Sequence, residues 1–249
     1  MIFDKLETQR NSKGTQVLAL IDPDVKNDNI FPQIIDTVNK SNFDGLLVGG
    51  SRIVDDNFNK RLLFIKENTD LPIILFPGDS SQISDNAEAI LFLSLLSGRN
   101  PKYLIEEQVI SARRINDLNI EVIPTGYLLL KTEKKSAVEL ISNTTPLDMN
   151  NTNNVIDHCL AAQYMGNKLL FLECGSNSDS SVELSLLKQI KSKITIPLMV
   201  GGGIKNKEMA LNLAEAGASY LVIGSLIEQT LDFNITLDIN QSVRGLYVS

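Results

Sequence analysis

Acidic side chains directly follow two of the apolar runs in this sequence. Asp22 comes after Val17–Ile21, and Glu173 comes after Leu169–Leu172. A carboxylate in such a place can hold Mg²⁺ through hard oxygen ligands, or it can accept a proton from a substrate hydroxyl. Each residue also has a structural interpretation, since Asp22 opens an Asp-Pro turn and Glu173 can be satisfied by backbone donors. The end of a strand favours the metal role for Asp22 and the proton-accepting role for Glu173.

Glycine loops and hydroxyls occupy the corresponding places after other apolar runs. The loops Gly175-Ser176, Gly202-Gly203 and Gly224-Ser225 let backbone N–H groups approach a ligand without interference from a Cβ. Ser51 follows Gly45–Val48 and Tyr127 follows Pro124-Thr-Gly, and we take Tyr127 with Asp22 and Glu173 as candidate catalytic residues. In a (β/α)₈ barrel the loops after the last two strands are a frequent phosphate site, which predicts a phosphorylated substrate held mainly by backbone donors.

These residues need a scaffold that brings strand ends together. Eight short apolar runs alternate with helical patterns, which predicts an α/β fold, a single (β/α)₈ TIM-type barrel forming one domain over residues 1–249. The predicted strands are Val17–Ile21, Gly45–Val48, Pro72–Phe76, Ala89–Leu93, Ile120–Pro124, Leu169–Leu172, Pro197–Val200 and Tyr220–Ile223. The predicted helices are Asn29–Lys40, Asp55–Glu67, Pro101–Asn116, Asn153–Met165, Val182–Lys191 and Asn206–Ala216.

Two local features refine this topology. Only Pro77–Glu88 separates the third and fourth runs, which is too short for a full crossover helix, so the third helix is expected to be missing or reduced. In the Pro101–Asn116 helix, the spacing of Ile105, Val109, Ala112 and Ile115 predicts an apolar face turned toward the barrel.

Bulk composition excludes several classes of function. The net charge of -7 argues against nucleic-acid binding, which needs a basic patch. Two cysteines, Cys159 and Cys174, do not make a disulfide framework and favour reduced thiols in the cytoplasm. The N-terminus has no apparent signal peptide and no run reaches 18 apolar residues, so we expect a cytoplasmic protein without a transmembrane helix.

Four other conspicuous features have simple structural explanations. Asp55-Asp56-Asn57 looks like an aspartate-rich diphosphate motif, but it opens a predicted helix, where acids favour the positive end of the dipole. His158 lies inside a predicted helix, and we expect a surface or supporting position for it. Cys174 lacks a histidine partner, and Lys131, Lys134 and Lys135 are expected to be solvated.

Ten segments at or near strand ends together form a specific pattern. They are Leu20-Ile-Asp-Pro-Asp24, Val48-Gly-Gly-Ser51, Ile74-Leu-Phe-Pro-Gly78, Leu91-Phe-Leu-Ser-Leu-Leu-Ser97, Arg99-Asn-Pro101, Ile123-Pro-Thr-Gly-Tyr-Leu128, Leu172-Glu173, Gly175-Ser176, Val200-Gly-Gly-Gly-Ile204 and Ile223-Gly-Ser225. The pattern resembles the geranylgeranylglyceryl phosphate synthases and their longer-chain bacterial relatives, over about Thr15 to Glu228.

The resemblance implies a modified TIM barrel without its third helix and an Mg²⁺-dependent prenyltransferase. Such an enzyme joins a prenyl diphosphate, here geranylgeranyl diphosphate, to the C3 hydroxyl of sn-glycerol 1-phosphate and makes an ether-lipid precursor. By resemblance, Asp22 and Ser51 form the Mg²⁺ site, and Glu173 holds and deprotonates the attacking hydroxyl. The implied glycerol-phosphate site comprises Leu172, Glu173, Gly175, Ser176, Gly202, Gly203, Gly224 and Ser225.

Further expectations concern the prenyl chain, the partners and the departures from the family pattern. The missing helix would expose Leu75, Phe92 and Leu93 as a groove for the prenyl chain. We expect a homo-oligomer, a dimer or a hexamer, with transient membrane contact for the lipid product. The first family motif reads Asp-Pro-Asp-Lys, whereas here Val25 displaces the lysine to Lys26. Phe171 stands where a tyrosine is common.

Two other functions stay open. One is another phosphate-binding barrel, such as a sugar-phosphate isomerase, which usually needs an acid–base pair on opposite strands, whereas the fifth strand here ends in Thr-Gly-Tyr. The other is a non-catalytic phosphate- or lipid-binding barrel, against which the intact Asp22, Ser51 and Glu173 argue.

Overall fold

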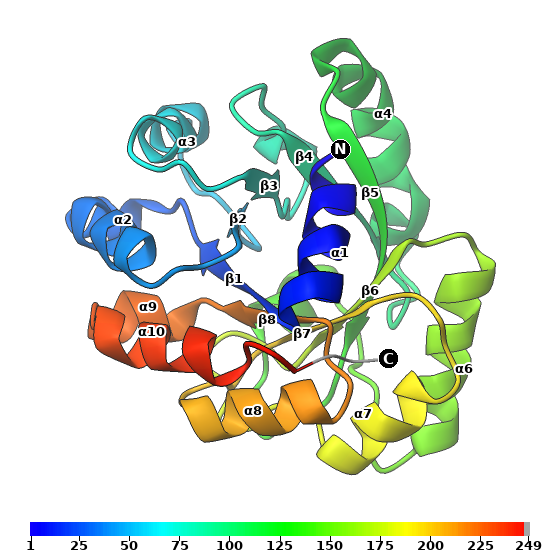
Figure 1. Ribbon diagram of the computed structural model, residues 1–249. Helices are drawn as coiled ribbons and strands as arrows, with labels where there is room; N and C mark the ends of the chain where they lie inside the picture. Colours follow the sequence, from blue (N-terminus) through cyan, green and yellow to red (C-terminus); the bar gives the residue numbers. More distant parts are fainter. Residues whose placement is uncertain (247–249) are drawn as a thin grey trace.

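The apolar runs form eight parallel strands that close into a barrel, as predicted (Figure 1). The computed structural model describes residues 1–246, and each strand pairs with the next while β8 pairs back onto β1. The strands are β1 (Gln16–Ile21), β2 (Gly45–Val48), β3 (Ile73–Leu75), β4 (Ala89–Leu95), β5 (Glu121–Leu129), β6 (Leu169–Glu173), β7 (Leu198–Gly201) and β8 (Tyr220–Ile223).

Helices surround the barrel and cover its outer face (Figure 1). They are α1 (Ile2–Lys13), α2 (Phe31–Lys40), α3 (Phe58–Glu67), α4 (Glu107–Leu118), α5 (Ala137–Ser142), α6 (Thr152–Tyr164), α7 (Leu184–Lys191), α8 (Lys207–Glu215), α9 (Ser225–Thr230) and α10 (Phe233–Ser242). Shorter turns are η1 (Val25–Asn27), η2 (Ser80–Gln82) and the π-helical η3 (Lys102–Glu106). Within residues 1–246, no helix is both long and apolar enough to cross a membrane.

The core has two layers because both faces of each strand are buried. One layer lies inside the barrel and includes Leu18, Leu47 and Phe171, and the other lies between the strands and the helices. Helix α1, which the sequence patterns did not predict, closes the end of the barrel where the strands begin (Figure 1). Its Leu6 packs in the inner layer, and Glu7 accepts a hydrogen bond from the Tyr220 hydroxyl.

The connection between β3 and β4 lacks an α-helix, as the short Pro77–Glu88 segment predicts. The 3₁₀ turn η2 stands in its place. The third crossover of the barrel is therefore reduced, and it leaves one flank of β4 uncovered by an α-helix.

The prediction of which face of the Pro101–Asn116 helix turns toward the barrel is wrong. Ile105 and Val109 are 57% and 67% exposed, whereas Gln108 and Ser111 point inward together with Ile115. The π-helical turn η3 precedes α4 and shifts the register of the side chains that follow it. The Gln108 amide donates to the Leu93 carbonyl, which holds this polar side chain on the inner face.

The fifth strand is longer than predicted. It extends to Leu129, so Tyr127 lies within the strand, and its side chain is buried inside the barrel. The last two pairs of its register with β6 are Leu128↔Leu172 and Leu129↔Glu173, so the two strands end at the same level of the barrel.

Candidate active site

The strand ends of β6, β7 and β8 enclose a polar cavity of about 340 Å³. Its lining brings together most of the residues that the sequence predicted to bind glycerol phosphate: Glu173, Ser176, Gly202, Gly203, Gly224 and Ser225. Leu172 and Gly175 do not line it. Leu172 is fully buried in the layer under the helices, because its position in β6 turns it away from the barrel axis.

Backbone conformation explains the glycines of this cavity. Gly202 and Gly203 have φ angles of 86° and 73°, in the left-handed region that glycine adopts without steric cost. A Cβ on Gly203 would collide with the backbone carbonyl of Ser180, and a Cβ on Gly202 would lie 2.9 Å from the Gly175 backbone. These two glycines are thus required by their neighbouring loops, independently of any ligand.

Glu173 is the buried acid of the cavity. Its side chain is 7% exposed, and burial raises its pKa from 4.5 to about 7, while a 2.6 Å hydrogen bond from the Gly175 N–H to Oε1 opposes this rise. A Cβ at Gly201 would lie 2.7 Å from Oε2, so the glycine makes room for the carboxylate. A carboxyl group with a pKa near neutrality can exchange a proton with a substrate hydroxyl efficiently.

Tyr127 lines a second, apolar cavity and lies near the Glu173 carboxylate. This cavity is an apolar groove, and the pKa of Tyr127 is raised well above 10.0 by burial and by the nearby Glu173 carboxylate. Its ring packs edge-on against Phe76 and Phe171, with centroid distances of 5.8 Å and 5.3 Å. The phenol therefore stays protonated and can only donate or accept hydrogen bonds.

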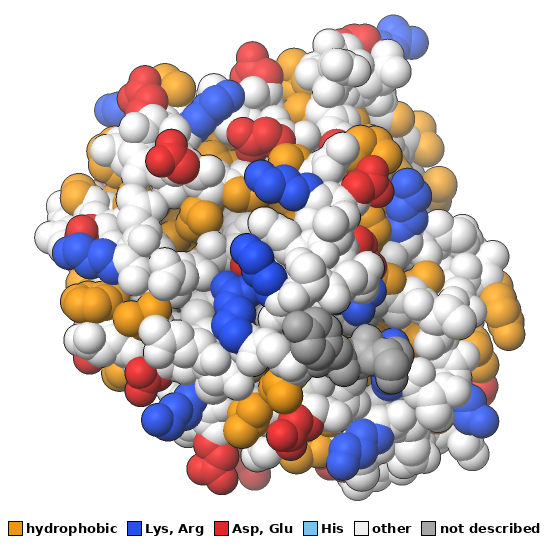
Figure 2. Space-filling model, in the orientation of Figure 1, with side chains coloured by type: hydrophobic (Ala, Val, Ile, Leu, Met, Phe, Trp, Pro, Cys, Tyr) orange, Lys and Arg blue, Asp and Glu red, His pale blue; other side chains and the backbone are white. Residues whose placement is uncertain are grey.

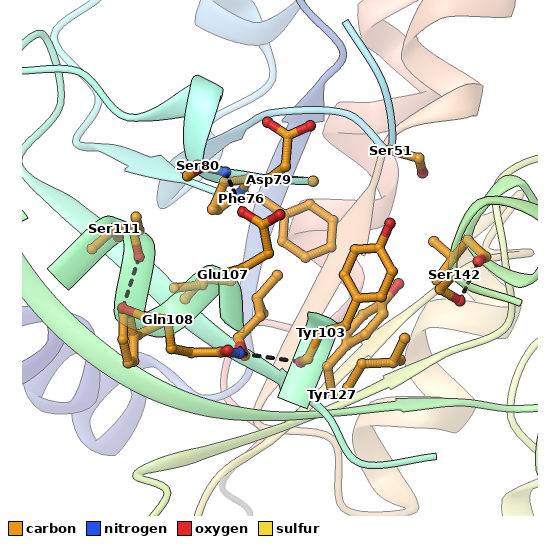
Figure 3. A pocket seen from close by; sticks show the side chains of 18 of the residues that line it. Ser51, Phe76, Asp79, Ser80, Tyr103, Glu107, Gln108, Ser111, Tyr127 and Ser142 are labelled. Atoms are coloured by element: carbon orange, nitrogen blue, oxygen red, sulfur yellow. Dashed lines mark hydrogen bonds between the residues drawn. The ribbon is translucent and has the colours of Figure 1, made fainter. Parts of the chain in front are cut away.

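The apolar groove occupies the flank that the missing third helix leaves open. Figure 3 shows its walls, with Phe76 and Asp79 on the β3–β4 side, and Tyr103, Glu107 and Gln108 on the side of η3 and α4. Phe92 and Leu93 line it as predicted. Leu75 does not, because its side chain is fully buried in the layer between strands and helices.

Ser51 lines this groove, and Asp22 lies beside the neighbouring Gly50. Gly50 and Ser51 line the groove, and the carboxylate of Asp22 lies directly against Gly50, where a Cβ would collide with Oδ1. Asp22 Oδ1 is buried without a hydrogen-bond partner, so a cation bound there would satisfy it. Burial raises the pKa of Asp22, and Lys26 opposes that rise.

This geometry fits a single-carboxylate Mg²⁺ site. Mg²⁺ is typically held by one or two carboxylates together with substrate phosphates, so three protein ligands are not required. Within residues 1–246, no group of three or more His, Cys, Asp and Glu side chains is placed to hold a metal ion. The Lys26 ammonium lies 2.6 Å from Asp22 Oδ2, so the displaced lysine still reaches the first strand end.

Two lysines at the rim of the polar cavity were not expected from the sequence. Lys134 and Lys205 both line it, and Asp179 holds them at 2.6 Å and 2.9 Å. The Asp179 carboxylate raises the pKa of Lys134, so this ammonium stays charged. The position of Lys205 directly after the Gly-Gly-Ile loop could have predicted a lysine at this cavity. Lys134 gave no such signal, because it belongs to a run of lysines that we expected to be solvated.

The other conspicuous residues have structural roles. Asp55 and Asp28 hold the buried guanidinium of Arg61, which lowers the pKa of both carboxyl groups. His158 lies away from both cavities, with Nδ1 2.7 Å from the Asn154 carbonyl and Nε2 3.1 Å from Arg99. Cys174 is buried, and burial raises its thiol pKa so that no reactive thiolate forms.

Comparison with known proteins points to one family. The model of the PcrB family matches residues 9–241. Geranylgeranylglyceryl phosphate synthase of Flavobacterium johnsoniae is 39% identical over 92% of this chain and 93% of its own length. The corresponding protein of Methanosphaera stadtmanae is 36% identical over 86% of this chain and 87% of its own.

Solved structures agree with these relatives. The crystal structure of (S)-3-O-geranylgeranylglyceryl phosphate synthase from Thermoplasma acidophilum, in complex with its substrate sn-glycerol-1-phosphate, superimposes with a TM-score of 0.90. It is 32% identical and covers 98% of both chains. Thiamine phosphate pyrophosphorylase from Pyrococcus furiosus, at 13% identity and a TM-score of 0.60, shares the fold alone.

Proposed function

The chain belongs to the PcrB family, and on that premise we propose that it transfers a geranylgeranyl chain from its diphosphate to sn-glycerol 1-phosphate. The observation that carries this proposal is the position of Glu173. A buried carboxylate with a pKa of about 7 lies in a glycine-lined polar cavity, and the nearby Tyr127 lines an apolar groove. One cavity suits a small phosphate ester and the other suits a hydrocarbon chain.

Glycerol phosphate is held by the polar cavity in this proposal. The loops at Gly202–Gly203 and Gly224–Ser225 supply backbone N–H donors to the phosphate, and Lys134 and Lys205 supply positive charge at the rim. These groups matter in a chain of net charge -7, since its overall field repels a phosphate. The glycerol hydroxyls then extend toward Glu173.

The prenyl diphosphate lies across the groove in this proposal. Its hydrocarbon tail packs along Phe92 and Leu93, and its diphosphate reaches Asp22 and Ser51 at the end of the groove. Mg²⁺, held there by Asp22 and Ser51 with the diphosphate oxygens, would stabilise the negative charge of the leaving group. Lys26 adds a second cation beside Asp22.

The proton of the reaction is assigned to Glu173. The C3 hydroxyl oxygen of glycerol phosphate forms a bond to C1 of the prenyl group as the bond from C1 to the diphosphate oxygen breaks. The hydroxyl proton passes to the Glu173 carboxylate, and diphosphate leaves with the bonding electron pair. Tyr127 keeps its proton, so its hydroxyl orients the reacting oxygens by hydrogen bonding while its ring forms part of the groove wall.

Three further features belong to this proposal. The product carries a long apolar chain, so we propose transient contact with a membrane when it leaves. We propose a cytoplasmic location, which suits the two buried, unpaired cysteines. We also propose that the protein works as a homo-oligomer.

The experiment is product identification. The purified protein is incubated with Mg²⁺, sn-glycerol 1-phosphate and prenyl diphosphates of several lengths, and the products are identified by mass spectrometry. Formation of an ether with geranylgeranyl diphosphate, and its loss with sn-glycerol 3-phosphate or with excess chelator, is the expected result. If no ether forms while glycerol phosphate still binds, the protein is a phosphate-binding barrel. Isomerisation of a sugar phosphate would point to the alternative enzyme class.

A further inference from the structure

Glu228 is a second acid near Asp22, the proposed metal ligand. It belongs to α9 and lies about one helical turn after Gly224–Ser225. Because β8 pairs with β1, the helix that follows β8 begins next to the end of β1, where Asp22 lies. Glu228 therefore stands between two strand ends that the proposed function uses, one for the phosphate and one for the metal.

The buried side chain of Asn27 connects Glu228 to the main chain of Asp22. Asn27 is 4% exposed, and its Nδ2 donates to the Asp22 carbonyl at 2.9 Å and to Glu228 Oε1 at 3.1 Å. The turn η1 holds Asn27 in this place, because Asp24 accepts from the backbone N–H groups of Lys26 and Asn27. Both hydrogens of the Asn27 amide group are thus used, one on each partner.

Glu228 also interacts directly with the end of β1. Burial raises the pKa of Glu228, whereas the Lys26 ammonium and a hydrogen bond from the Asp22 backbone oppose the rise. Glu228 is therefore engaged with the main chain of Asp22, while the Asp22 carboxylate points elsewhere. Its Oδ2 contacts Lys26, and its Oδ1 has no hydrogen-bond partner. The contacts with Glu228 and Asn27 thus fix the main chain of Asp22 and leave Oδ1 free to bind a cation.

We propose that Glu228 is a positioning residue for Asp22 in the prenyl transfer. Through Asn27 and the Asp22 backbone it fixes the end of β1, so that Asp22 Oδ1 is held beside Gly50. Residues that orient a metal ligand typically change metal affinity about 10- to 100-fold when they are replaced. The inference rests on the proposed function for the identity of the metal, and it adds a residue that binds neither metal nor substrate.

A purely structural role of Glu228 would have a different consequence. Its carboxylate would then only hold α9 against the barrel. Gly224–Ser225 opens α9 and belongs to the phosphate loops, so a loosened helix would weaken the binding of glycerol phosphate. A positioning role predicts instead that metal binding weakens while the binding of glycerol phosphate does not change.

Electron paramagnetic resonance of Mn²⁺ measures metal binding without turnover, since the oxygen ligands that suit Mg²⁺ also suit Mn²⁺. Glu228→Ala and Asn27→Ala, each in the full-length chain, are expected to raise the Mn²⁺ dissociation constant at least about tenfold. The affinity for sn-glycerol 1-phosphate, measured by calorimetry, is expected to stay at the wild-type value. The double variant is expected to lose less than the product of the two single losses, because both residues belong to one chain of hydrogen bonds.

Two further variants complete the experiment. Glu215→Ala removes the same charge from the end of α8, on the face of the molecule where the strands begin. Figure 2 shows this face, on which charged side chains are scattered, and a change there is expected to leave Mn²⁺ binding as in the wild type. Glu228→Gln keeps the size of the side chain and is expected to weaken Mn²⁺ binding, so it tests Glu228 even if the alanine variant does not fold. Circular dichroism checks the fold of each variant.

Several outcomes would overturn the inference. Wild-type Mn²⁺ affinity in the folded Glu228 variants does so, as does an equal loss of affinity for Mn²⁺ and for glycerol phosphate. If the losses in Glu228→Ala and Asn27→Ala multiply in full, the two residues act separately and the link between them is wrong. A wild type that binds no Mn²⁺ contradicts the inference whatever its activity. A wild type that binds Mn²⁺ but makes no ether contradicts the proposed function alone, and the Mn²⁺ affinities of the variants still decide the role of Glu228.

Discussion

Replacing Glu173 with glutamine is expected to remove activity and, above neutral pH, to stabilise the fold. Burial raises the pKa of Glu173 from 4.5 to about 7. Since each pKa unit corresponds to about 1.36 kcal/mol, the ionised carboxylate costs the folded state about 3 kcal/mol. Glutamine is nearly isosteric, its carbonyl still accepts from the Gly175 N–H, and it carries no charge that must be desolvated.

The sign of this effect depends on pH in a defined window. Below pH 4.5 the carboxyl group is protonated in both states, so wild type and variant are equally stable in this respect. Between 4.5 and about 7 the unfolded chain loses the proton that the folded chain keeps, and wild-type stability falls. Above about 7 the full cost is present, so the stability advantage of Glu173→Gln grows through this window and then stays constant.

Activity is expected to follow the opposite course. The wild-type kcat rises with pH, is half-maximal near the pKa of about 7 and levels above it, as the base becomes ionised. Glu173→Gln lowers kcat by about 10² to 10⁴ with little change in the KM for glycerol phosphate, because hydrogen bonding survives while proton acceptance does not.

Urea unfolding and steady-state kinetics at about pH 5 and about pH 8 measure both effects. Glu215→Gln, at an exposed position of α8, is the control and should show no pH-dependent gain in stability. A glutamine variant that is less stable than wild type at the higher pH would contradict the assigned burial cost. A variant with altered KM and unchanged kcat would reduce Glu173 to a residue that positions the substrate.

Three other predictions concern the metal, a glycine loop and a buried ion pair. Asp22→Asn is expected to raise the half-saturating Mg²⁺ concentration at least about tenfold, which is the usual loss of metal affinity when a residue of a metal site is changed. A calorimetric Mg²⁺ titration of the variant that matches the wild type would refute the assignment. Gly203→Ala should destabilise the fold, because its Cβ collides with the Ser180 carbonyl. Gly224→Ala should fold normally, because its Cβ lies 3.4 Å from Leu20, and it should raise the KM for glycerol phosphate. Equal unfolding midpoints for the two alanine variants would count against this distinction. Arg61→Leu should lower the free energy of unfolding by about 2 to 3 kcal/mol, since the partly exposed carboxylates of Asp28 and Asp55 lose their partner. A change below about 0.5 kcal/mol in urea unfolding would show that these ion pairs are dispensable.

Buried strands and strand-end residues were predictable from the sequence because both faces of a barrel strand are apolar. Gly45–Val48 and Tyr220–Ile223 were predicted with the bounds that the structure has. Glu173 was expected at the mouth of the barrel and lines the polar cavity there. The reduced third crossover followed from the number of residues available to Pro77–Glu88, which is a geometric limit and needs no detail of packing.

The inward face of the fourth crossover helix was not predictable from periodicity. A stripe of apolar residues on a helix indicates that this face is buried, but it does not say whether it packs against the barrel or against another molecule. Ile105 and Val109 follow the stripe and point outward, while the inward Gln108 donates its amide N–H groups to two backbone carbonyls and leaves Oε1 without a partner. The π-helical turn that sets this register has no signature in hydrophobic spacing.

The sequence predicted which loops line the polar cavity, but not the direction of each side chain in them. Gly203 was expected to leave room for an anion, but a Cβ at this position would point at Ser180. Lys134 was expected in solvent, and it reaches the cavity rim because Asp179, from another loop, holds it. Pairings between distant loops of this kind depend on tertiary structure and leave no local pattern.

The most direct test of the proposed site is a crystal structure of the protein with sn-glycerol 1-phosphate and a non-reactive prenyl diphosphate analogue. The expected complex has the glycerol phosphate anion between the loops at Gly202–Gly203 and Gly224–Ser225, with a glycerol hydroxyl within hydrogen-bonding distance of Glu173. The hydrocarbon chain is expected along Phe92 and Leu93, beyond Tyr127. A saturated complex with the anion elsewhere and these loops empty would contradict the assignment of both cavities.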